Sequence, residues 1–129
     1  MNSKTTYMKQ MMVLVAGPYR SGTNDDPKLI QANVNAMTDT ALEVYRCGHL
    51  PVMGEWFALP LIEATGSKVI GDEVFNEIFH PVAVQLIDHC DAVLRIGGSS
   101  AGADEMVNKG YEKGKLIYHS IAELPDFYK

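Results

Sequence analysis

The sequence predicts an α/β fold: a single-domain, three-layer doubly wound sandwich with a mainly parallel sheet of four to five strands. Two observations carry this prediction. Short continuous apolar runs, at residues 11–16 and 92–96, are typical of strands buried on both faces of a sheet that helices cover. Segments with helical periodicity lie between the strands and are joined to them by short loops, which favours parallel strands with right-handed connections.

The composition is that of an ordinary globular domain. The chain has 129 residues, of which 47% are hydrophobic and 21% charged, enough for one core without disulfide or metal staples. A net charge of -5 argues against a protein that binds a nucleic-acid polymer, although free nucleotides remain possible ligands. Because Cys47 and Cys90 lie in no metal-binding or redox motif, we expect two buried thiols and neither a metal nor a cofactor.

Residues 1–10 are expected to form a flexible leader, and residues 11–129 the domain. The leader is polar and lacks the apolar stretch of a signal peptide, and no segment approaches the length needed to span a bilayer. We therefore expect a cytoplasmic protein with no membrane partner.

The first strand, at residues 11–16, leads through a loop of small residues to the first helix. Asp26 is the expected N-cap of this helix, with Pro27 in its first turn. Apolar residues at helical spacing predict that it runs over residues 28–46, and Gly48 is expected to close it.

A short second strand follows at residues 49–53. Residues 54–71 are the least regular part of the chain, apolar and aromatic but interrupted by proline, and hold the one tryptophan, Trp56. We expect a short helix there, leaning over the carboxyl edge of the sheet. The next helix is expected over residues 72–90, kinked or divided by Pro81.

The third strand is predicted at residues 91–96, the next helix at 104–113, the last strand at 115–119 and at most a helical turn in the tail, 120–129. This alternation of strands and helices predicts a Rossmann- or flavodoxin-like domain. In such sheets ligands bind at the carboxyl ends of the strands, where the strand order switches direction. The loops that follow the first and third strands both emerge at that edge.

The loop after the third strand, residues 97–103, is rich in glycine, serine and alanine. Glycines let the backbone approach a ligand, and the unpaired N–H groups of the following helix favour an anion. The alternative is that Ser100 merely caps the helix. Asp104 and Glu105 follow at once; either carboxylate suits a nucleophile or an electrostatic stabiliser, or simply stabilises the first helical turn.

The loop after the first strand presents Tyr19 and Arg20 within a Gly-Pro-Tyr-Arg-Ser-Gly turn. The arginine can contact a phosphate or carboxylate with two hydrogen bonds, and the tyrosine can place its hydroxyl beside a sugar. Alternatively, the tyrosine packs over the sheet edge and the arginine points to water. Trp56 could stack on a nucleobase or pack in a lid or an interface.

Two further kinds of polar residue lie outside the candidate motifs. Asp91 precedes the third strand and so lies at the opposite edge, where a bond to a neighbouring backbone is the expected role. His80, His89 and His119 show no metal-ligand spacing.

Residues 15–22 and 91–105, in this order, resemble the nucleoside 2-deoxyribosyltransferase superfamily. The chain is most similar to a branch of small bacterial and phage proteins, and also resembles the N-glycosidases that hydrolyse deoxynucleoside 5′-monophosphates. The resemblance implies that the first loop contacts the sugar or phosphate and the second binds the 5′ end of the ligand. The residues at these positions are Gly17, Arg20 and Gly22, and Ser100 and Gly102.

The catalytic carboxylates of the superfamily do not match directly. Its nucleophilic glutamate falls here on Met106, one residue after Glu105, and its second carboxylate falls on Ala83. The resemblance then implies attack on the anomeric carbon by Glu105, with Asp104 as second candidate, and a covalent intermediate resolved by water or another base. Tyr19 would orient the site.

Two other functions remain open. Residues 97–105 also loosely resemble the signature of cytokinin-activating phosphoribohydrolases, and a nucleotide-binding module without catalysis would keep the same anion site. Trp56 would cover the base in the catalytic hypothesis. Because members of the superfamily assemble and the stretch 56–62 is apolar, we expect a homo-oligomer, a dimer or tetramer.

Overall fold

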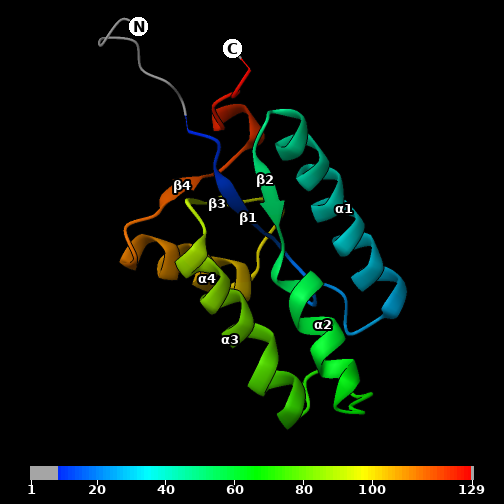
Figure 1. Cartoon of the computed structure of the whole chain (residues 1–129). Coiled ribbons are helices and arrows are strands. Elements are labelled where there is room, and N and C mark those ends of the chain that lie inside the picture. The colour runs from blue at the N-terminus through cyan, green and yellow to red at the C-terminus, as the bar shows by residue number, and fades with distance from the viewer. Residues whose placement is uncertain (1–8, 129) are drawn as a thin grey trace, which may run out of the picture.

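The computed structural model describes residues 9–128 and has four parallel strands in the order β2-β1-β3-β4 (Figure 1). The strands are β1 (Met12–Ala16), β2 (Leu50–Val52), β3 (Ala92–Arg95) and β4 (Leu116–Tyr118). The helices are α1 (Pro27–Arg46), α2 (Gly54–Ala64), α3 (Glu73–His89), α4 (Ala101–Glu112) and the 3-10 turn η1 (Ile121–Glu123). The predicted doubly wound α/β fold is confirmed.

Helices cover both faces of the sheet. Residues from α1 and the segment around η1 pack on one face, against alternate residues of the central strands such as Val13 and Leu94. Residues from α3 and α4 pack on the other face, against Leu14 and Val93, which stand opposite each other in the pairing of β1 with β3. Both central strands are buried on both faces, which is why their sequences are apolar without alternation.

The start and the end of α1 form as the sequence predicts. The Asp26 carboxylate accepts a hydrogen bond from the Lys28 N–H at 2.9 Å, and Pro27 occupies the first turn of α1. The helix ends before Gly48, whose φ of 95° few other residues adopt.

At the amino edge of the sheet, residues 9–12 make polar contacts with Asp91 and Gly48. Asp91 accepts a hydrogen bond from the Met12 N–H at 2.9 Å and pairs with Lys9, also at 2.9 Å. Asp91 thus has the structural role expected of it. The Gln10 side chain donates to the Gly48 carbonyl, so the last two residues of the expected leader make contacts with the domain, while residues 1–8 lie outside the described part.

The middle of the chain is more regular than its sequence suggested. The stretch after β2, expected to hold a short helix, forms the 11-residue helix α2, which continues through Pro60. Pro81 does not divide α3, which is one helix of 17 residues. Each proline removes one backbone donor, but the packing of α2 against α3 holds both helices together. Its core includes Ala58, Ile62 and Phe75.

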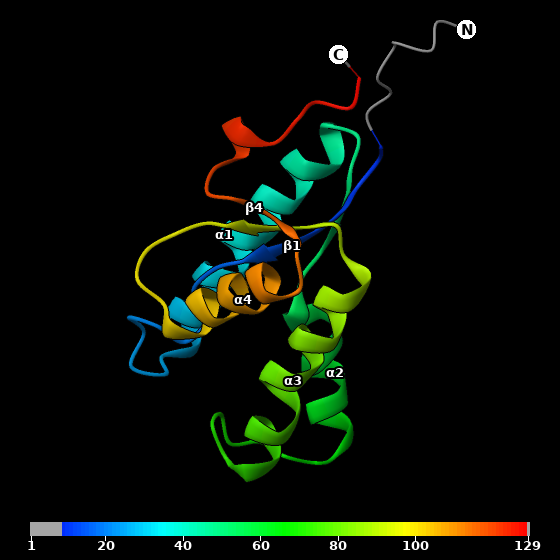
Figure 2. The same ribbon diagram turned by 90° about the vertical axis from the view of Figure 1, so that its left-hand side faces the viewer.

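The α2–α3 pair extends beyond the sheet, as the two views in Figures 1 and 2 show. Its base meets the carboxyl edge of the strands, because α2 begins directly after β2. Within residues 9–128 no helix is long and apolar enough to cross a membrane.

Candidate functional site

A cavity of about 460 Å³ lies at the carboxyl end of β1, beside the start of α4. We call it the switch-point cavity, because the connections from β1 and β3 leave in opposite directions there. Its walls come from β1 and the β1–α1 loop, the first turn of α2, one side of α3 and the first turns of α4. Its volume falls in the range usual for small-molecule sites.

Six of the nine candidate site residues from the sequence line this cavity. They are Gly17, Tyr19, Arg20, Gly22, Ser100 and Gly102. The tertiary structure thus brings the two loops together at one edge, as the parallel sheet requires.

The two expected carboxylates do not line the switch-point cavity. Glu105 is exposed on α4, whereas the next residue, Met106, is 5% exposed and lines the cavity. Gly102, Ala103 and Met106 lie on the inward face of α4, because residues three and four apart share one side of a helix. One residue is a rotation of about 100°, so Glu105 points away.

Asp104 faces the opposite side of the β3–α4 loop. Its carboxylate accepts a hydrogen bond from Arg95 Nε at 3.1 Å, and both residues line a second cavity with His119. The Arg95 guanidinium also donates to the carbonyl groups of Ile96 and Gly98. Arg95 therefore holds the loop in place, and Asp104 helps to position Arg95.

Trp56 is also outside the walls of the switch-point cavity. It lies on α2 with 42% of its surface exposed. Its neighbours Gly54 and Glu55 do line the cavity.

Glu55 is the carboxyl group that sequence reasoning missed. It lies in the first turn of α2 and is only 9% exposed. Burial raises its pKa from an ordinary 4.5 to about 7, although a hydrogen bond from its own backbone N–H partly opposes this. One signal could have found it: an acidic residue within three positions of the end of a strand lies at the carboxyl edge, and residues 56–62, which follow it, are apolar.

Aromatic rings form one wall beside Glu55. Phe75 and Phe79 stack with centroids 4.7 Å apart, and Tyr19 lies 4.9 Å from Phe79. The pKa of the Tyr19 hydroxyl is raised, mainly by burial and further by the negative charge of Glu55. Such a wall offers flat apolar surface to a planar ligand group.

The start of α4 forms the opposite wall. The Ser100 hydroxyl accepts a hydrogen bond from the Ala103 N–H at 3.1 Å, so the capping role considered for it is confirmed. A Cβ on Gly102 would lie 2.7 Å from His80 Nε2, so the glycine lets the His80 imidazole lie against the first turn. The earliest N–H groups of α4 have no partner inside the helix, and the helix dipole favours an anion there.

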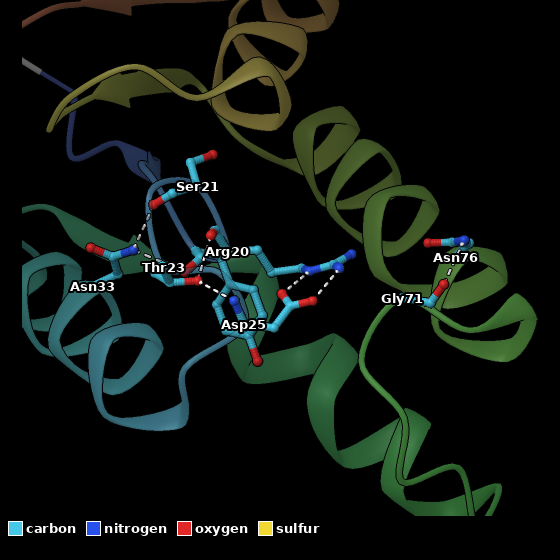
Figure 3. Close-up of polar contacts among 8 residues, drawn as sticks. Arg20, Ser21, Thr23, Asp25, Asn33, Gly71 and Asn76 are labelled. Atoms are coloured by element: carbon cyan, nitrogen blue, oxygen red, sulfur yellow. Dashed lines mark hydrogen bonds and ion pairs between the residues drawn. The ribbon is translucent and has the colours of Figure 1, made fainter.

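The β1–α1 loop is held by its own hydrogen bonds (Figure 3). Thr23 is 3% exposed; its hydroxyl donates to the Arg20 carbonyl and accepts from the Asp25 N–H. From α1, the Asn33 amide donates to the carbonyl groups of Tyr19 and Ser21. These contacts fix where Tyr19 and Arg20 enter the cavity.

The Arg20 guanidinium lies at the mouth of the cavity. It pairs with both carboxylate oxygens of Asp25, at 2.8 and 2.9 Å, and its central carbon is 5.8 Å from the Phe75 ring centroid. A Cβ on Gly71 would lie 2.7 Å from Arg20 Nη1. Arg20 thus spans from the β1–α1 loop to the turn between α2 and α3.

In the part of the chain that the structure describes, no three His, Cys, Asp or Glu side chains are grouped as ligands of one metal ion. Cys90 is buried, which raises the pKa of its thiol to about 11.

The chain matches no known protein-family model and no curated protein sequence.

Proposed function

We propose that this protein binds a nucleoside or a nucleoside 5′-monophosphate in the switch-point cavity and cleaves its N-glycosidic bond, with Glu55 as the catalytic carboxylate. The observation that carries the proposal is the position of Glu55: a buried carboxyl group beside Tyr19 and an aromatic wall, at the ligand edge of a doubly wound sheet. The resemblance of the two loops to the nucleoside 2-deoxyribosyltransferase superfamily supports the substrate class.

In this proposal the ionised Glu55 attacks the anomeric carbon of the sugar. A carbon–oxygen bond forms as the bond to the base nitrogen breaks, and the base leaves with the electron pair and takes a proton from water. Water then hydrolyses the glycosyl ester, which releases the sugar and restores the carboxylate. A desolvated carboxylate with a raised pKa is a stronger nucleophile than an exposed one, but it is ionised only above about pH 7.

The remaining walls suit the rest of such a ligand. The rings of Phe75 and Phe79 can pack against the base. The Arg20 guanidinium and the first turn of α4, with Ser100 and Gly102, are two cationic or dipolar groups on the same cavity. They suit the sugar hydroxyls or a 5′-phosphate.

A second candidate, a nucleotide-binding module without catalysis, is favoured by one observation. The position that holds the nucleophile in the superfamily is Met106, and the nearby Glu105 faces solvent. The third candidate is a phosphoribohydrolase, whose substrates carry ribose rather than the deoxyribose that the resemblance to the deoxyribosyltransferases implies.

The test measures base release from deoxyribonucleosides, ribonucleosides and their 5′-monophosphates by wild-type protein, Glu55→Gln and Glu105→Gln. We expect Glu55→Gln to lower the rate by about a hundredfold or more and Glu105→Gln to leave it unchanged. Loss of activity in Glu105→Gln alone would contradict the role of Glu55. Preference for ribose monophosphates would favour the phosphoribohydrolase, and saturable binding without release would favour the binding module.

We also propose that the chain forms a homo-oligomer through α2. Trp56, Phe57 and Leu61 are large apolar side chains of this helix that remain about half exposed. Light scattering at micromolar concentration tests this, with Phe57→Glu expected to give a monomer; a monomeric wild-type protein would contradict it.

A further inference from the structure

Asp25 differs from Glu55, the other acidic residue that lines the cavity, because its carboxylate is already paired with Arg20. Both of its oxygens accept hydrogen bonds from Arg20, through Nε and Nη2. The pair is exposed to solvent, with 39% and 47% of the two side chains accessible, and both residues line the switch-point cavity. The positive charge of the Arg20 guanidinium at the cavity is therefore partly neutralised by the Asp25 carboxylate.

The backbone is arranged to make this pair. Asn24 and Asp25 have φ values of 50° and 59°, in the left-handed region that Asn and Asp tolerate better than other non-glycine residues. The Thr23 hydroxyl accepts from the Asp25 N–H and thereby holds the turn. The turn brings Asp25 back to Arg20, five residues earlier, as Figure 3 shows.

The Asp25 carboxylate has no part in starting α1. That role belongs to the next residue, Asp26, whose side chain accepts from the Lys28 N–H. For Asp25, the side-chain hydrogen bonds within residues 9–128 both come from Arg20. The two neighbouring aspartates thus have separate roles: Asp26 caps α1, and Asp25 pairs with Arg20.

We propose that Asp25 competes with the anionic group of a ligand for Arg20, and so sets how strongly the cavity prefers a phosphorylated ligand over a neutral one. This inference rests on the proposed function, since it takes the ligand to be a nucleoside with or without a 5′-phosphate. A phosphate can make the same two-bond contact with the guanidinium as the carboxylate does. To bind there it displaces Asp25 and then lies close to a like charge.

The expected effect of removing the charge follows from this. Asp25→Asn frees the guanidinium and removes the repulsion, so a dianionic phosphate should bind about 3- to 10-fold more tightly, as the loss of an exposed ion pair allows. The affinity for a neutral nucleoside should change less than about twofold. The gain should shrink in about 0.5 M NaCl, because salt screens exposed charges.

Asp26→Asn is the matched control. It removes the same charge one residue away, and asparagine caps a helix as well as aspartate does. Asn also tolerates the left-handed backbone at position 25, so both variants should fold; thermal unfolding checks this.

The experiment is calorimetric titration of wild type, Asp25→Asn and Asp26→Asn with inorganic phosphate, deoxyadenosine and deoxyadenosine 5′-monophosphate. Tighter binding of the two phosphates by Asp25→Asn alone supports the inference. Equal gains in both variants, or weaker binding by Asp25→Asn, overturn it. If neither deoxyadenosine nor its monophosphate binds, the panel of base-release substrates decides the proposed function separately. Inorganic phosphate still decides the inference: tighter binding by Asp25→Asn supports the competition, and no difference overturns it.

Discussion

Replacing Glu55 by glutamine should make the protein more stable at high pH, and the size of the effect follows from its burial. In the folded protein the pKa is about 7, against an ordinary 4.5. Below pH 4.5 both the folded and the unfolded chain hold the proton. Between these two values only the folded chain holds it, so the free energy of unfolding falls as pH rises, by about 3 kcal/mol in total.

Most of that loss lies in an accessible pH range. Between about pH 5 and about pH 8, Glu55 should cost the wild type about 2.5 kcal/mol. Glu55→Gln has no charge to bury, so its stability relative to wild type should increase by that amount over the same range. Any constant difference in hydrogen bonding or packing between the two side chains cancels when the two ends of the range are compared.

The assay is urea unfolding of both proteins at several pH values. The control is Glu73→Gln, because Glu73 is an exposed acidic residue in the first turn of α3, as Glu55 is a buried one in the first turn of α2. Its effect should stay below about 1 kcal/mol throughout. Parallel stability curves for wild type and Glu55→Gln would refute the burial of a titrating carboxyl group at this position.

The same titration should govern activity. If Glu55 acts as the ionised nucleophile, base release by wild type rises as pH increases through about 7. A rate that instead falls through this range would show that the protonated form is the active one, as for a general acid.

The remaining predictions concern three close contacts of the fold and the site. Gly110→Ala should destabilise the protein by about 1–3 kcal/mol, measured by urea unfolding, because its Cβ would lie 2.8 Å from Val93 Cγ2; unchanged stability would show that the contact yields. Gly102→Ala should weaken ligand binding more than it lowers stability, since its Cβ would displace His80. Calorimetric titration measures the loss of binding and thermal unfolding the loss of stability. Ligand binding by Gly102→Ala equal to that of wild type would contradict this prediction. Thr23→Val should lower stability by about 1–3 kcal/mol, because it removes a buried hydroxyl with two hydrogen bonds; unfolding that matches wild type would count against this.

Local sequence determined the order of the elements and the edge at which the site lies. The apolar run of β1, the Asp26 cap with Pro27, and the small residues before α4 are signals that act within a few residues. A parallel sheet then places the loops after β1 and β3 together, whatever the details of packing. This is why Tyr19 and Ser100 could be assigned to one cavity from the sequence.

Tertiary structure decided which carboxyl group enters that cavity. The sequence predicted a helix that starts at Asp104, but α4 begins at Ala101. Its packing on β3 turns Met106 inward and Glu105 outward. The residues of α2 looked irregular because of Pro60, yet packing against α3 makes them helical and buries Glu55. The rotation of a helix and the burial of one acid depend on contacts between segments far apart in the chain, which no local pattern of residues records.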